Sequence, residues 1–95
     1  MDPRYQELLN AIVQKQASIL GVAVTVRRTR KVAGLVVGDD GKILSLTQPP
    51  LEALEQITKE FIDLSGDVGK VFCKVVAKET LKKYPDLKLP EILKD

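Results

Sequence analysis

Two short apolar runs flank the turn sequence Gly38-Asp39-Asp40-Gly41 near the middle of the chain. Aspartate tolerates turn geometry, and Gly41 supplies the positive φ angle that a tight reversal needs. The pattern predicts a β-hairpin with strands at about 35–38 and 42–46. A hairpin in this place divides the chain into two flanking segments.

Both flanking segments carry apolar residues at the spacing of a helix. Asp2 is a good N-cap for the first helix, and Pro3 suits the first helical position. A Ser-Gly-Asp break separates the two helices that follow the hairpin, and Pro85 ends the second of them. The predicted elements are helices over 3–20, 51–64 and 67–84 and a C-terminal tail over 86–95.

The segment 22–33 is ambiguous. Its first residues, Val22 to Val26, are rich in β-branched side chains and favour a strand. The cations that follow suit the last turn of a helix, and Gly34 suits the left-handed position just beyond it. We expect the helix, in which case Gly34→Ala destabilises the protein by about 1 kcal/mol.

These elements predict a predominantly helical α+β fold of two helical hairpins, 3–20/22–33 and 51–64/67–84, joined by the β-hairpin. The alternative is an αβββαα arrangement in which 22–30 forms a strand. The length of 95 residues predicts a single small domain over 1–95.

Composition excludes several kinds of chemistry. The chain has no histidine, which removes Ser-His-Asp and Cys-His catalysis and every histidine metal site. Cys73 is the single cysteine, so an intramolecular disulfide cannot form, and we interpret this residue as a small buried hydrophobe. Without a long apolar run we expect no signal peptide and no membrane span. The sequence therefore predicts a cytoplasmic protein that is not an enzyme and holds no metal or cofactor.

Positive charge clusters in two places although the formal net charge is only +2. One cluster is the basic run at 27–31, and the other is a row of lysines spaced by four along the last helix, which we call the lysine row. Either cluster can contact an anionic partner, but each is also typical of a solvated helix surface. The candidate contacts are Arg27, Arg28, Arg30, Lys31, Lys70, Lys74, Lys78 and Lys82.

The last helix also has an apolar face that is candidate core or candidate dimer interface. Near-continuous apolar residues in this helix indicate more apolar surface than one small monomer can bury. We therefore expect a non-catalytic protein-interaction or regulatory module that acts as a homodimer. The alternative is a nucleic-acid-binding protein that uses the basic run and the lysine row. The residues of the apolar face are Val68, Val71, Phe72, Val75 and Val76.

Overall fold

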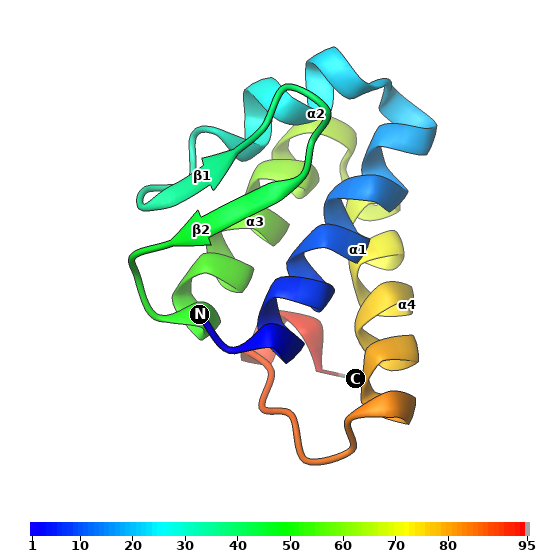
Figure 1. The fold of residues 1–95 in the computed structure, drawn as a ribbon. Helices are drawn as coiled ribbons and strands as arrows, with labels where there is room; N and C mark the ends of the chain where they lie inside the picture. The colour runs from blue at the N-terminus through cyan, green and yellow to red at the C-terminus, as the bar shows by residue number, and fades with distance from the viewer. Residues whose placement is uncertain (95) are drawn as a thin grey trace.

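The computed structural model describes residues 1–94 as four α-helices, a β-hairpin and a short C-terminal 3-10 helix. Figure 1 shows the hairpin on one side of the helices, with the two long helices α1 and α4 side by side. The fold is the predominantly helical α+β arrangement predicted from the sequence. The elements are α1 (Pro3–Leu20), α2 (Val22–Thr29), β1 (Leu35–Val37), β2 (Ile43–Leu46), α3 (Pro50–Ser65), α4 (Asp67–Lys83) and η1 (Glu91–Leu93).

The first helix begins as its sequence predicts. The Asp2 side chain accepts a hydrogen bond from the backbone N–H of Arg4 at 2.9 Å, and Pro3 occupies the first turn. Gly21 ends α1 with a φ angle of 89°, and α2 begins at the next residue. The chain therefore turns within one residue, and α2 passes across the upper end of the molecule in Figure 1.

The segment after Gly21 is a helix, so the strand alternative for 22–30 is wrong. The helix is shorter than predicted, however, because it ends at Thr29 rather than at 33. Residues 30–34 form a tighter turn, in which the Val32 N–H donates to the Thr29 carbonyl at 3.1 Å and the Val32 side chain is buried. Burial of Val32 in the core thus competes with continuation of the helix.

Gly34 has the positive φ that the sequence predicts, at 76°, but for a different reason. It follows the tighter turn instead of capping the helix, and it leads directly into β1. Its carbonyl accepts the Thr47 N–H at 2.8 Å. A β-carbon built at Gly34 would lie 2.6 Å from the Thr47 hydroxyl. The requirement for glycine therefore has two sources, the left-handed backbone and the close approach of the neighbouring chain.

The two strands pair antiparallel, with Leu35 opposite Leu46 and a bulge in the register after Val36. Side chains from the helices bond to the outer edges of this small sheet. The side-chain amide oxygen of Asn10 accepts a hydrogen bond from the Ile43 backbone N–H at 2.8 Å. The Arg30 guanidinium donates to the Val37 backbone carbonyl at 3.0 Å. These bonds join the hairpin to α1 and to Arg30 just after α2, and they occupy backbone groups that could otherwise pair with another strand.

The second pair of helices is packed closely at one glycine. Gly66 ends α3 and α4 begins at Asp67, so the two helices lie against each other with a minimal connection. A β-carbon at Gly69 would lie 2.6 Å from the Ser65 hydroxyl and would clash with the Phe61 carbonyl. The approach of α4 to α3 therefore depends on the missing side chain at Gly69.

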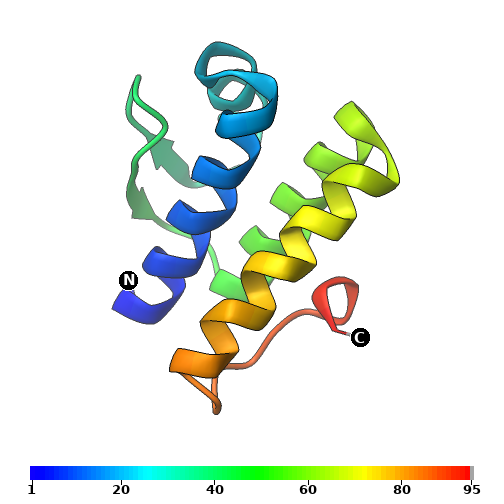
Figure 2. The same ribbon diagram turned by 90° about the vertical axis from the view of Figure 1, so that its right-hand side faces the viewer.

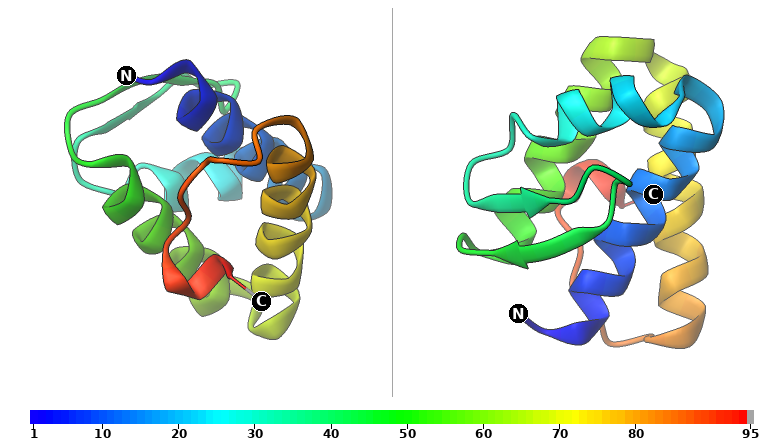
Figure 3. Two further views of the ribbon diagram at one scale, coloured as in Figure 1. Left: turned by 90° about the horizontal axis from the view of Figure 1, so that it is seen from below. Right: turned by 45° about the horizontal axis from the view of Figure 1, so that its top comes forward.

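The core lies between α1, α3 and α4 and beneath the hairpin. It is closed at one end by the tail, which runs from the end of α4 to η1 and contacts both α3 and α4 (Figures 2 and 3). Leu87, Leu89 and Leu93 are buried there, so the tail packs against the core; Asp95 lies outside the described residues. The fully buried large side chains include Leu8, Leu9, Ile12, Ile43, Leu54, Ile57 and Phe61.

Candidate functional site

The cations of the basic run do not form one patch, because two of them pair with carboxylates in different parts of the molecule. Arg28 donates to Asp63 of α3 at 2.6 Å and lies 3.6 Å from a Glu60 oxygen. Its hydrogen bond holds the pKa of the Asp63 carboxyl below its usual range. Arg30 instead pairs with Asp39 of the hairpin turn at 2.8 Å. Two of the four cations therefore brace different elements of the fold, while Arg27 and Lys31 are exposed.

The lysine row follows α4. Lys70 and Lys74 are half-buried, and Lys78 and Lys82 are exposed. The neighbouring α3 is acidic, but two of its acidic residues, Glu60 and Asp63, face Arg28 of α2 rather than the lysine row.

The predicted apolar face divides between the inside and the outside of the molecule. Val76 is 6% exposed and belongs to the core, whereas Phe72 is half-buried beside α1. The other three members of the face point outward, and we call them the α4 strip. They are Val68, Val71 and Val75, which are 54%, 54% and 41% exposed.

The inward face of α4 consists of small residues that sequence reasoning did not single out as a group. Gly69, Cys73 and Ala77 are buried, and Gln16 of α1 donates from its amide to the Gly69 carbonyl at 3.2 Å. Small residues let the neighbouring helices approach on this side, where Val76 is buried as well, whereas Val68, Val71 and Val75 lie on the surface. The spacing of Gly69, Cys73 and Ala77 by four was the available signal in the sequence.

Exposed apolar side chains also occur on two other surfaces. On the hairpin, Val36 is 48% exposed, and Leu44 on the facing strand is exposed as well. At the junction of α1 and α2, Ile19 and Val22 are exposed as well. The α4 strip differs from both because its three side chains lie on successive turns of one long helix.

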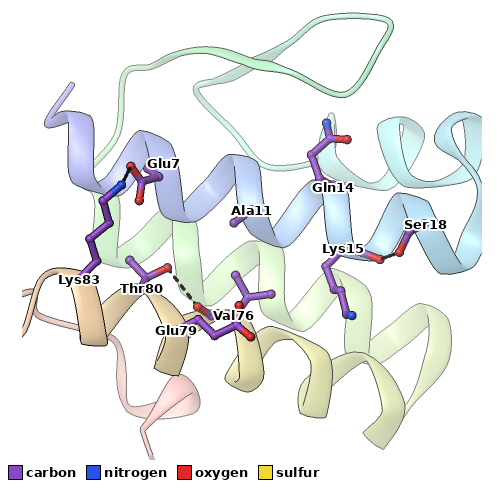
Figure 4. Close-up of a pocket in the computed structure, with 9 residues that line it drawn as sticks. All are labelled: Glu7, Ala11, Gln14, Lys15, Ser18, Val76, Glu79, Thr80 and Lys83. Atoms are coloured by element: carbon purple, nitrogen blue, oxygen red, sulfur yellow. Dashed lines mark hydrogen bonds and ion pairs between the residues drawn. The ribbon is translucent and has the colours of Figure 1, made fainter.

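A groove of about 470 Å³ lies between α1 and α4 (Figure 4). At one end Lys83 donates to Glu7 at 3.1 Å, and the Tyr84 hydroxyl donates to the same carboxylate oxygen at 3.1 Å. Farther along, Lys15 lies over the ring of Phe72, with its amine 5.2 Å from the ring centre. Lys15, which lines the groove, is a cation that sequence reasoning did not assign to this face.

Several ionisable groups have pKa values displaced away from neutral pH. Burial raises the pKa of the Cys73 thiol to about 11. The hydrogen bond to Glu7 raises the pKa of Lys83, and the hydrogen bond from Arg4 lowers the pKa of Asp2. These three shifts each move the pKa of the group away from pH 7. Cys73 is confirmed as a buried thiol.

Within residues 1–94, no three side chains of the histidine, cysteine, aspartate and glutamate types come together as a metal site. Over the same residues, no helix combines the length and the apolar character that crossing a membrane requires. Comparison of the chain with protein-family models, with curated proteins and with solved structures finds no match.

Proposed function

We propose that the protein is a non-catalytic protein-interaction module that docks a partner on the outward face of α4. The observation that carries this proposal is the α4 strip. Three valines stand more than two-fifths exposed on successive turns, while the core behind them is closed by other residues. Exposed apolar side chains that adjoin one another within a polar surface are typical of interaction sites.

The other apolar surfaces support a partner less well. Val36 and Leu44 lie on a two-stranded sheet. A partner strand is hindered from adding to its outer edges, because Asn10 and Arg30 already bond to backbone groups there. The α4 strip is held on a helix of 17 residues that packs against α1 and α3. A rigid surface loses little conformational entropy when a partner binds, which favours the strip as the docking site.

Photo-crosslinking in the native host tests this proposal. A photoreactive phenylalanine analogue is placed at position 71, and at the similarly exposed position 36 as the matched control. We expect a discrete protein adduct from position 71 that is absent from position 36 and is lost when Val75→Lys is added. Equal adducts at both positions, or none at position 71, contradict the proposal.

Nucleic-acid binding through the basic run and the lysine row is the weaker alternative, because Arg28 and Arg30 already pair with carboxylates. Such binding would fall steeply with salt, since each neutralised phosphate releases counterions. Gel shifts at about 50 and 200 mM salt measure that dependence. A tight, salt-sensitive complex that tolerates Val71→Lys would replace the interaction module with this alternative.

A further inference from the structure

The spacing of the α4 strip specifies the shape of what it binds. Val68, Val71 and Val75 follow the i, i+3, i+7 pattern of the seam along which one helix packs against another. Valine is stiff at χ1, so these side chains form a fixed row of knobs. A surface that enters a membrane interface more often presents tryptophan, phenylalanine or leucine, and none of these is a member of the strip. The strip therefore fits a helix of a protein partner.

The charge around the strip specifies the chemistry of that helix. The same seam continues along α4 through two members of the lysine row, Lys78 and Lys82, and Lys74 lies beside it. On the side toward α1, Lys15 extends over Phe72. The helix as a whole carries five lysines against two acidic residues, Asp67 and Glu79. An apolar centre with a positive border is complementary to an apolar helix with a negative border.

Building on the proposed function, we infer that the partner is an acidic amphipathic helix of another protein. Its apolar residues pack on the α4 strip, and its aspartates and glutamates lie opposite Lys74, Lys82 and Lys15. The charges steer the encounter and select the partner, and the valines exclude water at the centre of the contact.

A second copy of the chain, which the sequence analysis favoured, is less complementary. If two α4 helices pair antiparallel about a two-fold axis near Val71, Val68 meets Val75 of the other copy, but the two lysine rows then lie on the same side. Like charges oppose that contact. The chain's own acidic helix, α3, cannot replace the partner because Leu54, Ile57 and Phe61 bury its apolar face in the core.

The accessible surface area of the chain agrees with that of a folded monomer. The accessible area is 5243 Å². A compact monomer of 10.5 kDa is expected to expose about 5400 Å². A single copy therefore buries as much as an ordinary folded monomer, and the strip does not have to be covered for the chain to fold.

The test is selection from a displayed library of helical peptides of about 20 residues, in which the apolar seam is kept and the flanking positions are randomised. The wild-type protein is the target, and Val71→Lys is the counter-target. We expect enrichment of peptides with aspartate and glutamate at the flanks. Their affinity should fall at least about tenfold in Lys74→Glu/Lys82→Glu and remain unchanged in Lys42→Glu and Val36→Lys, which alter the hairpin.

The outcomes separate this inference from the proposed function. Enrichment of basic or neutral flanks overturns the acidic partner and leaves the docking surface standing. Lack of any peptide that prefers wild type over Val71→Lys overturns both. Sedimentation that shows a dimer at high micromolar concentration, abolished by Val71→Lys, replaces the foreign helix with a second copy. Binding to vesicles of phosphatidylcholine and phosphatidylserine that Val71→Lys abolishes would overturn the protein partner in favour of a membrane surface.

Discussion

The inward face of α4 is built mainly from small residues, whereas its outward face carries larger valines. Inward, Gly69 lets the helix approach the Phe61 carbonyl of α3, and Val76 is almost fully buried. Outward, Val71 and Val75 pack against nothing that would bury them. The difference teaches that apolar character alone does not place a residue in the core. Close approach does so, and on α4 it occurs where the residues are small.

Gly69→Ala should lower the free energy of unfolding the most, because it disrupts the packing of the inward face of α4 against α3. In an open helix this exchange stabilises by up to about 1 kcal/mol, because alanine is the better helix former. Here the added methyl group has no room beside Ser65 and Phe61, so we expect a loss of about 3 kcal/mol. Urea denaturation measures the free energy of unfolding, with Val68→Ala on the outward face as control. A gain in stability for Gly69→Ala would show that the helices are not in close contact at this glycine.

Alkaline pH probes the inward face through Cys73. Burial raises the pKa of its thiol from 9.0 to about 11, so the folded protein holds the proton more tightly than the unfolded chain. The contribution of the protonated thiol to the free energy of unfolding is complete below pH 9. It is lost as the pH rises from 9 to 11, so the free energy of unfolding falls by about 1.4 kcal/mol per pH unit.

The measurement is the pH dependence of the free energy of unfolding in wild type and in Cys73→Ala. Because the other titrating groups are common to both proteins, the difference between the two curves reports the thiol. A difference that stays constant across pH 9 to 11 would mean that the Cys73 thiol is accessible to solvent.

Two adjacent valines compare the faces directly. Val76→Ala removes two buried methyl groups and should cost about 2 kcal/mol. Val75→Ala removes the same atoms from a side chain that is 41% exposed, and alanine is the better helix former, so its effect should lie within about 0.5 kcal/mol of zero. Both variants are compared by urea denaturation. Equal losses would contradict the orientation of α4.

The smallest effect on stability is expected for Val71→Lys. Lysine can extend into solvent from an outward position, so the free energy of unfolding should change by less than about 0.5 kcal/mol. The thermal midpoint should then shift by no more than a few degrees. A large drop would place Val71 in the core and remove the α4 strip as a docking surface.

Much of the fold follows from local signals. The turn around Gly41 and the break at Gly66 correctly located the hairpin and the second helical pair, because turn chemistry acts over a few residues. The end of α2 was misjudged by four residues, at Thr29 instead of 33, because the burial of Val32 depends on the core rather than on neighbours in sequence. Gly34 has its predicted φ sign, although Thr47, which is distant in sequence, adds the second reason for it.

The sequence by itself determined the order of the elements and the type of most of them, because helical spacing and turn residues are local properties. The segment 22–33 remained ambiguous between helix and strand until the tertiary structure showed α2. Only the tertiary structure decided which valines of α4 lie outside and where each arginine goes. Apolar residues occur at helical spacing on more than one side of α4, and the close packing at Gly69 selects which side is buried. In the same way, the sequence of a basic run does not indicate which carboxylates its side chains will pair with. Arg28 pairs with Asp63 and Arg30 with Asp39 only because folding brings those carboxylates within reach.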